Sequence, residues 1–441
     1  MEYAVLGLLF CIAVVHAVLS FKRVSLGQYL HNSCETSLLF TAASAVAGNV
    51  GAGTVVGIFT FAARGKGVAF YIALCYAAGL LLTAFMAKRI YTRNHELKAN
   101  SFIDFLVNYF GQDTRIVVWI AVGAIFFMQM AAQLLALGTI LQSTMPFSLE
   151  ASIFFAYLFV TIYLLSGGYY SVTKMDCLQF VFIFLSALCI FFYLDWPQVL
   201  QHIENVYTPE HYGPVFIAGI FLFLAPSAFV SIDNWHRVIS AKDALTARNA
   251  FIITAVLCFL VYVSYALLGL LAPVGATEPV TTMRRLFPSY LSFFGIISLV
   301  AAVVSTMDAT ILPLAAPICS LVSKRRLAAM RLTVFALMTG IALVAYFLNN
   351  VVTGLIGALS SLVALFPAVF TALRGDRPSA LALKISLPTA IAGAVVFVKI
   401  NEEYAFLVGI ALSFALYYSI AYFDLGRMRK QERSAASSHD V

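Results

Sequence analysis

An asparagine and four glycines interrupt a long apolar run between residues 47 and 57. Glycine is a poor helix former, and each backbone polar group left without a hydrogen bond in lipid costs several kcal/mol. Such a stretch can lie at membrane depth only where it is buried in protein or lines a wet cavity. Freed carbonyl groups there can hold a cation, and freed N–H groups can hold an acidic group of a solute. The stretch therefore predicts a broken membrane helix of the kind that transporters use.

Composition places the whole chain in the membrane. Hydrophobic residues make up 62% of the 441 residues, charged residues only 11%, and the mean hydropathy is +0.94. A soluble domain has about 25% charged residues. The sequence has no hydrophilic block long enough for a second domain, and no metal-ligand pair, nucleophile motif or phosphate-binding loop. We expect an all-α polytopic membrane protein that is not an enzyme.

Thirteen apolar segments approach the ~20 residues that a membrane-spanning helix needs. They cover approximately residues 3–20, 37–62, 68–88, 116–143, 150–166, 177–194, 214–232, 250–272, 290–321, 331–348, 351–372, 380–398 and 404–423. Basic residues follow the first segment and do not precede it, which is the reverse of a secretory signal. We therefore expect the first segment to be retained as a helix.

Basic residues predict the orientation, because loops on the cytoplasmic side are enriched in Lys and Arg. With the N-terminus outside, 22 of the 27 Lys and Arg residues fall in inside loops and 5 in outside loops. The inside loop after the seventh segment holds Arg237, Lys242 and Arg248. The prediction is a multi-pass protein of the cell (inner) membrane with a cytoplasmic C-terminus. Its net charge of +7 then reflects orientation in the lipid bilayer, and no nucleic-acid partner is expected.

The two expected breaks predict an internal symmetry. The second segment is broken by its glycines, and the seventh is expected to break at Pro226, which lacks a backbone donor. Because the breaks are five segments apart, the second unit enters the membrane in the opposite orientation, as in inverted repeats. A core of 5+5 helices results, with a broken helix first in each repeat. The predicted parts are an extra helix and loop (1–36), two repeats (37–194 and 195–372), two extra helices (373–423) and a cytoplasmic tail (424–441), functional as a monomer.

Polar side chains in the ninth segment point to a cation. Ser305 and Thr306 are adjacent hydroxyls, and Asp308 follows two residues later. A carboxylate in a span costs at least a few kcal/mol and faces protein or water, and hydroxyl, carbonyl and carboxylate oxygens suit a hard cation. The alternatives are hydroxyls bonded to carbonyls of the preceding turn and an aspartate neutralised by an interior partner.

Further polar residues are candidates for solute contact and charge transfer. Gln129 and Gln133 lie one helical turn apart and either contact a solute or hydrogen-bond to another helix. Together with Asn49 and Ser227 they are predicted to face one solute cavity between the repeats. Asp176 ends a loop that leads into the sixth segment, where it is expected to approach Asp308, unless it only interacts with its own helix dipole.

At these positions the sequence resembles the sodium:solute symporter family, which includes sodium/proline, sodium/sugar and sialic acid transporters. The family's Gly-Gly-x-x-Ala-x-x-x-Thr-Asp-x-x-Gln motif is similar to an ungapped run at Gly167, Gly168, Ser171, Met175, Asp176 and Gln179. The family's serine pair is similar to Ser305-Thr306 with Ala302 before it, and its Gln-Arg pair is similar to His236-Arg237. The glycine-rich second segment also matches in register at Gly57.

The resemblance implies a leucine-transporter-type fold and a sodium ion held by Ala47, Val50, Ala302, Ser305 and Thr306. Some relatives hold a second sodium near the motif aspartate, where they carry serines. This chain has Asp308-Ala309 in that place, so Asp176 and Asp308 are candidates for a second cation or a proton.

The combined prediction is a sodium-coupled secondary symporter that imports a small polar organic solute by alternating access. Two alternatives remain open: proton coupling, and a symporter-like sensor that acts through a separate signalling partner. The solute stays undefined, because Ser231-Ile232-Asp233 fits neither the sugar nor the proline branch of the family.

Overall fold

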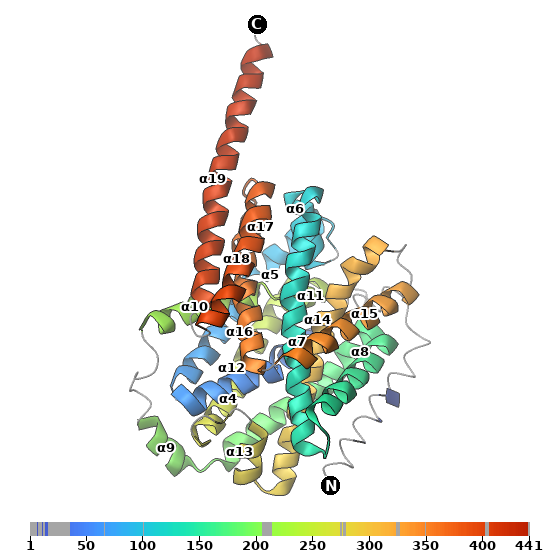
Figure 1. The fold of residues 1–441 in the computed structure, drawn as a ribbon, viewed down its shortest axis with the longest axis vertical. Coiled ribbons are helices and arrows are strands. Elements are labelled where there is room, and N and C mark those ends of the chain that lie inside the picture. Colours follow the sequence, from blue (N-terminus) through green and yellow to red (C-terminus); the bar gives the residue numbers. More distant parts are fainter. Residues whose placement is uncertain are drawn as a thin grey trace.

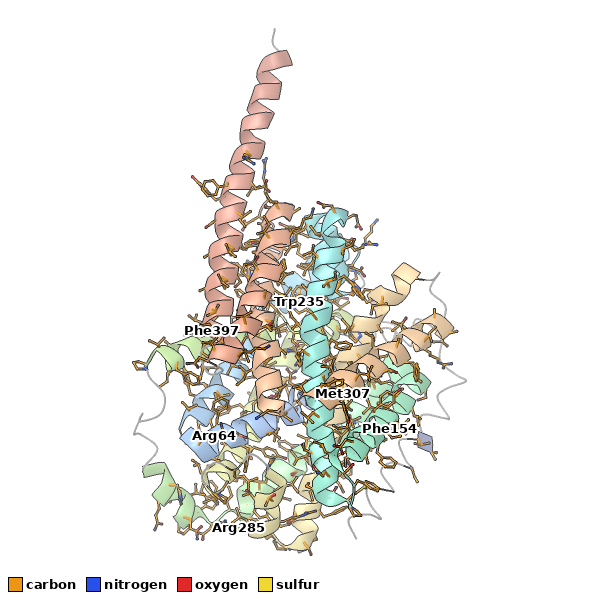
Figure 2. The ribbon with its side chains drawn as sticks, in the orientation of Figure 1. Arg64, Phe154, Trp235, Arg285, Met307 and Phe397 are labelled. Atoms are coloured by element: carbon orange, nitrogen blue, oxygen red, sulfur yellow. The ribbon has the colours of Figure 1, made fainter. Side chains whose placement is uncertain are left out.

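The computed structural model describes residues 7, 11, 14–15, 36–65, 67–99, 101–204, 214–273, 276, 279–322, 327–348, 350–401 and 405–439. These residues form a bundle of helices, with one isolated backbone bridge and no extended sheet among them. Figure 1 shows the helices packed side by side, with the end of the last helix projecting beyond the others. Side chains fill the space between the helices (Figure 2). The predicted all-helical fold is confirmed.

The described helices are α3 (Leu38–Asn49), α4 (Ala52–Gly65), α5 (Val68–Glu96), α6 (Phe102–Phe110), η2 (Gln112–Thr114), α7 (Arg115–Thr144), α8 (Leu149–Tyr193), α9 (Trp196–Glu204), α10 (Pro214–Phe229), α11 (Ile232–Ser240), α12 (Ala244–Leu270), α13 (Pro279–Leu286), α14 (Ser289–Val322), α15 (Leu327–Phe347), α16 (Val351–Leu362), η3 (Val363–Leu365), α17 (Phe366–Arg374), α18 (Ala380–Ile400) and α19 (Ala405–His439).

Ten of the described helical segments are long and apolar enough to cross a membrane. Two bent pairs, α3 with α4 and α10 with α11, bring the number to 12 if each pair is one span. These correspond to the second through thirteenth predicted segments. The first predicted segment lies outside the described residues except for Gly7, Cys11, Val14 and Val15, which are helical.

Two predicted loops are helical in the structure. The fifth and sixth segments and the expected loop between them form the single 45-residue helix α8, so Asp176 lies inside a helix and not at its start. The Gly-Gly motif does not end the helix. The predicted tail likewise continues α19 to His439, and its arginines, Lys430, Gln431 and Glu432 have good helix propensity.

Both breaks exist, but the second lies four residues beyond its predicted place. Val50 and Gly51 separate α3 from α4, which are bent by 51°. Pro226 lies inside α10, and the chain leaves the helix only at Val230 and Ser231, with a bend of 42°. A proline removes one backbone donor and can be absorbed in a membrane helix. The break falls instead where Ser231 adopts an extended conformation before α11.

Carbonyl groups freed at the breaks accept hydrogen bonds from side chains. Asn234 Nδ2 donates to Ala228 O at 2.8 Å, and Trp235 Nε1 donates to Phe229 O at 2.9 Å. At the first break, Tyr262 Oη donates to Asn49 O at 2.7 Å. These bonds satisfy the backbone at a depth where water cannot, so the breaks are stable features of the fold.

The two broken helices meet again at one end of the bundle. Thr36, just before α3, pairs with Ala241, just after α11, in a short parallel bridge. Thr36 N donates to Ser240 O at 3.3 Å, and Lys242 N donates to Thr36 O at 3.1 Å. We call this place the Thr36 end. Backbone hydrogen bonds join the two broken helices there.

Two glycines bring the helices next to the breaks into reciprocal contact. A Cβ on Gly79 of α5 would lie 2.5 Å from Ala225 O of α10, and a Cβ on Gly269 of α12 would lie 2.5 Å from Phe59 O of α4. Each helix that follows one broken pair thus packs backbone to backbone against the other broken pair. Only glycine permits such an approach.

We predict that Gly79→Ala and Gly269→Ala each destabilise the protein by about 1–3 kcal/mol, because the added methyl groups overpack a backbone contact. The apparent melting temperature in detergent measures the effect. Gly123→Ala in α7 is the control, since its Cβ would meet nothing within 4 Å. A melting temperature for Gly269→Ala equal to that of the control would contradict the close packing.

Candidate solute cavity and ion site

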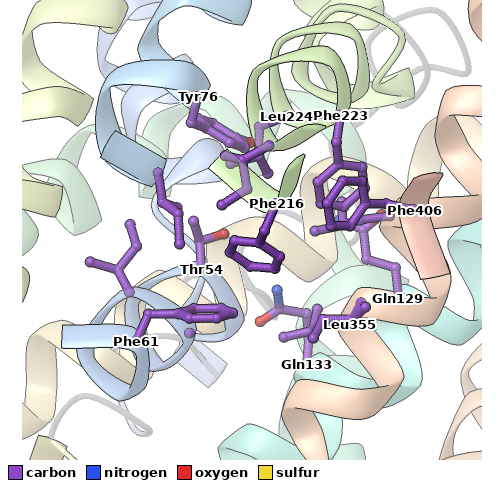
Figure 3. Close-up of a pocket in the computed structure, with 16 residues that line it drawn as sticks. Thr54, Phe61, Tyr76, Gln129, Gln133, Phe216, Phe223, Leu224, Leu355 and Phe406 are labelled. Carbon is purple, nitrogen blue, oxygen red and sulfur yellow. The ribbon is translucent and has the colours of Figure 1, made fainter. Parts of the chain in front are cut away.

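A cavity of about 110 Å³ lies beside the first break, beyond the end of α3. Figure 3 shows aromatic side chains gathered around it, with the amides of Gln129 and Gln133 among them. Its lining comes from α4, α5, α7, α10, α16 and α19: Thr54, Gly57, Ile58, Phe61, Ile72, Tyr76, Gln129, Gln133, Phe216, Ile220, Phe223, Leu224, Leu355, Ile356, Leu359 and Phe406. None of these lining residues is charged.

The four predicted solute residues divide between the cavity and the protein interior. Gln129 and Gln133 line the cavity. Asn49 is buried and bonded within the protein, donating to Asn234 Oδ1 at 2.7 Å and accepting from Tyr76 Oη at 2.9 Å. Ser227 is also buried and donates to Phe223 O at 2.7 Å. The single cavity predicted for all four therefore receives two of them.

Thr306, one of the residues predicted to hold sodium, meets the end of α3 where α14 crosses it. Thr306 Oγ1 lies 2.9 Å from Gly48 O and 2.9 Å from Ala302 O. Ala47 and Val50, on either side of this contact, are fully buried. A Cβ on Gly51 would lie 2.7 Å from Thr306 Oγ1 and 2.9 Å from Gln133 Nε2. We call Thr306 Oγ1, Gly48 O and Ala302 O the oxygen cluster. Gly51 and Gln133 lie between this cluster and the cavity.

The neighbouring Ser305 points to the motif aspartate. Its hydroxyl donates to Asp176 Oδ1 at 2.7 Å, and the Ser44 hydroxyl of α3 donates a short hydrogen bond to Asp176 Oδ2. Asp176 is 0% exposed and so joins α8, α3 and α14 in the interior. Hydroxyl, carbonyl and carboxylate oxygens in this arrangement suit a hard cation of low charge. The described residues hold no His, Cys, Asp and Glu group suited to a transition metal.

Asp308 lies one turn further along α14 and is also 0% exposed. Neither of its carboxylate oxygens has a partner of hydrogen-bonding geometry in the described part of the chain. Asp176 and Arg237 lie within electrostatic range of this carboxyl, and the Tyr163 hydroxyl and the Ala309 backbone N–H also interact with it. A buried carboxylate without well-formed hydrogen bonds is costly, so a cation or a proton beside it would stabilise it.

Arg237 was predicted to lie in an inside loop and is in fact in helix α11, with only 2% of its side chain exposed. Nη1 donates to Asp233 Oδ2 at 3.0 Å, Nε donates to Ser44 Oγ at 3.1 Å, and Nη2 lies 3.9 Å from Asp176 Oδ2. Loop-charge counting did not predict this burial, because it does not consider buried partners such as Asp233 in the same helix and Asp176 in α8.

Sequence reasoning missed a set of interior polar residues that hold the breaks together: Ser44, Gly48, Tyr76, Asp233, Asn234 and Tyr262. Most are single polar residues in apolar helices, a pattern with no spacing signal. The pairing of Asn49 with Asn234 spans 185 positions and depends wholly on the fold. The His236-Arg237 motif was the one available signal for this part of the site.

Comparison with known proteins gives matches in sequence and in fold. Residues 29–195 match the sequence model of the Sodium:solute symporter family. Human high affinity choline transporter 1 is 26% identical over 211 residues, covering 41% of this chain and 36% of the transporter. The Torpedo marmorata high-affinity choline transporter 1 is 28% identical over 216 residues, with the same coverage. The aligned region thus spans just over a third of the length of these relatives.

The fold is shared by solved transporters. A Na+-coupled sialic acid symporter in a substrate-bound outward-open state has a TM-score of 0.76 at 16% identity, covering 96% of this chain and 98% of the symporter. Mhp1, a nucleobase-cation-symport-1 family transporter, has a TM-score of 0.57 at 14% identity, covering 90% and 95%. The match over residues 29–195 confirms the resemblance predicted from the motifs and identifies this chain as a relative of the sodium:solute symporters.

Proposed function

We propose that this protein is a sodium-coupled symporter that imports a small polar organic solute by alternating access. The contact that carries the proposal is the one at Gly51, where Thr306 of the oxygen cluster and Gln133 of the cavity pack against the same residue. A cation at the cluster and a solute in the cavity would therefore touch the same break. The family match and the fold of a Na+-coupled relative support the same function.

The proposed sodium site uses Ala47 and Val50 carbonyl groups on α3 and the Ala302 carbonyl and Ser305 and Thr306 hydroxyls on α14. In the structure the Thr306 hydroxyl lies within hydrogen-bonding distance of Ala302 O, a proposed ligand, and of the neighbouring Gly48 O. Sodium would replace the hydroxyl proton as the positive partner of Ala302 O. Because the ligands come from two helices, binding would tie α3 to α14.

We propose that the protein lies in the inner membrane with its N-terminus outside and its C-terminus in the cytoplasm. This orientation puts the Thr36 end at the cytoplasmic face and the cavity on the outer side of the breaks. The reciprocal contacts at Gly79 and Gly269 support a core of two inverted five-helix repeats. The site would then lie at the repeat interface, as in other transporters built this way.

The lining of the cavity favours a particular kind of solute. Five aromatic side chains and two amides surround it: Phe61, Tyr76, Phe216, Phe223, Phe406, Gln129 and Gln133. Aromatic faces attract quaternary ammonium groups, and amides can orient a hydroxyl. Together with the choline transporters among the relatives, this makes choline the first solute to test.

Uptake into liposomes tests the function. Radiolabelled choline should accumulate under an inward sodium gradient, and replacing sodium with potassium should abolish accumulation. Accumulation driven equally by a proton gradient would support proton coupling instead. Binding without accumulation of any solute in a metabolite screen would support the sensor alternative.

We predict that the double variant Ser305→Ala/Thr306→Ala raises the sodium concentration for half-maximal uptake by about tenfold or more. A hydrogen bond or contact to a charged group contributes about 1.5–3 kcal/mol, and each 1.4 kcal/mol is tenfold. Thr254→Ala is the control, since this buried hydroxyl donates only to Ala250 O in the same helix. Unchanged sodium dependence in the well-folded double variant would rule out this site.

We predict that Gln133→Ala weakens solute affinity about two- to tenfold, because one hydrogen bond contributes about 0.5–1.5 kcal/mol. Competition with labelled solute at saturating sodium measures the affinity. Gln112→Ala is the matched control, since this amide lies on the surface and bonds to Asn108. Equal affinities of the two variants would place the solute elsewhere.

We propose that Asp176 and Asp308 form a second charged site, in which a cation or proton lies near the Asp308 carboxyl. Asp308→Ser would restore the hydroxyl that relatives carry, and it should add a second coupled sodium per solute. The ratio of sodium to solute flux in liposomes measures the change. Ala309→Ser alone, which keeps the carboxyl, is the control and should leave the ratio unchanged. An unaltered ratio for Asp308→Ser would show that Asp308 does not replace a second sodium site.

A further inference from the structure

We infer that Arg237 is the positioning residue that couples the cation site to closure of the Thr36 end, an inference that rests on the proposed sodium-coupled transport. Its guanidinium contacts three elements at once: Asp233 in its own helix α11, Ser44 in α3 and Asp176 in α8. A Cβ on Gly48 would lie 2.0 Å from Nη2, so the guanidinium also packs directly on the α3 backbone.

The same side chain is one contact away from the proposed sodium ligands. Asp176, which faces Nη2, accepts the hydrogen bond of Ser305. Gly48, which underlies the guanidinium, offers its carbonyl oxygen to Thr306. Any shift of Arg237 therefore moves a partner of each α14 hydroxyl. Conversely, a cation drawn to these oxygens acts on Asp176 and on the α3 backbone that the guanidinium covers.

Arg237 also lies directly behind the closed end of the bundle. It is one helical turn before Ala241, whose bridge to Thr36 closes that end. Ser44, its partner on α3, is two turns after Thr36. The guanidinium and the backbone bridge thus hold the same two half-helices at successive depths. All residues of α11 are buried, so the half-helix cannot separate from α3 without exposing this side chain.

The solute cavity lies on the other side of both breaks. Of the four half-helices at the breaks, only α4 and α10 contribute lining residues, and none of the lining residues described comes from α3, α8 or α11. The two breaks therefore separate α4 and α10, which line the cavity, from α3 and α11, which Arg237 holds together. We call α3 and α11 the locked half. Opening the Thr36 end requires the guanidinium to leave at least one of its buried carboxylates.

The electrostatic cost of separating these charges opposes opening of the Thr36 end. Separating a buried guanidinium from buried carboxylates leaves uncompensated charge in a low-dielectric interior, so the locked arrangement is strongly favoured. A sodium ion on the α3 and α14 oxygens adds a second tie to α3 and favours the same arrangement. Loss of the ion removes that tie. Release of sodium and opening of the Thr36 end are thereby coupled through Asp176 and Arg237.

Accessibility of a single cysteine tests the coupling without relying on transport. Ser240 is fully buried beside the bridge, so Ser240→Cys in a background without native cysteines reports opening of this end. With sodium present, a polar thiol reagent should modify this cysteine slowly. Adding Arg237→Gln should make modification about tenfold faster, as for a tenfold larger open population. Arg237→Lys keeps the positive charge but cannot contact Asp233 and Asp176 through separate nitrogens, so it should give an intermediate rate of modification.

Arg331→Gln is the control, because Arg331 is also a partly buried guanidinium and donates to Ser166 O of α8 at 3.4 Å. It should leave the rate unchanged. Equal rates in the unsubstituted, Arg237→Gln and Arg237→Lys backgrounds would overturn the inference. Because the readout is chemical modification, a chain that failed to move choline or sodium would contradict the proposed function and still report on Arg237.

A second measurement keeps the test decisive if Arg237→Gln does not fold. Thr36→Cys and Ala241→Cys place two cysteines across the bridge in a chain that keeps Arg237. Their oxidation should abolish transport while sodium-dependent solute binding remains, and a reductant should restore transport. Full transport by the oxidised protein would show that this end does not open during the cycle.

Discussion

The structure depends on how backbone groups freed at two helix breaks find partners inside a membrane. Each unpaired carbonyl there costs several kcal/mol, yet both broken spans need the gap to expose oxygen atoms. Side chains from other elements of the core donate hydrogen bonds to these carbonyl groups: Thr306 to Gly48 O, Tyr262 to Asn49 O, Asn234 to Ala228 O and Trp235 to Phe229 O. The breaks are thus held by tertiary contacts, and neither half-helix can shift without losing some of them.

Buried charge is the second consequence of this arrangement. Asp176, Asp233 and Asp308 lie in the interior with the guanidinium of Arg237 between the first two, and Asp308 has no hydrogen bond of its own among the described residues. Like charges at low dielectric repel strongly, so such a cluster attracts a positive ion. The adjacent hydroxyl and carbonyl oxygens give that ion a place to bind. These charges support the proposed cation site independently of any relative.

A structural feature could be predicted from the sequence when neighbouring residues cause it, and could not when contacts between distant residues cause it. The glycines from 48 to 57 lower the local helix propensity, so a break within this stretch could be predicted, and it falls at Val50 and Gly51. The break predicted at Pro226 was misplaced because Asn234 and Trp235 stabilise the second break by donating to Ala228 O and Phe229 O, contacts that depend on the fold. Gln129 and Gln133 share a helical face, so their common direction was predictable. Arg237 was misplaced because loop-charge statistics do not show which arginine has buried partners.

The cavity and the locked half are joined by a short chain of hydrogen bonds. Tyr76 lines the cavity and bonds to Asn49, and Asn49 bonds across the breaks to Asn234 at the start of α11. A solute that displaced the Tyr76 hydroxyl would disturb an amide pair that spans both broken helices. Gln133 offers a second route, through Gly51 to Thr306. In the proposed mechanism the solute and the cation would therefore act on the same two breaks from opposite sides, which is the physical requirement for coupling one flux to the other.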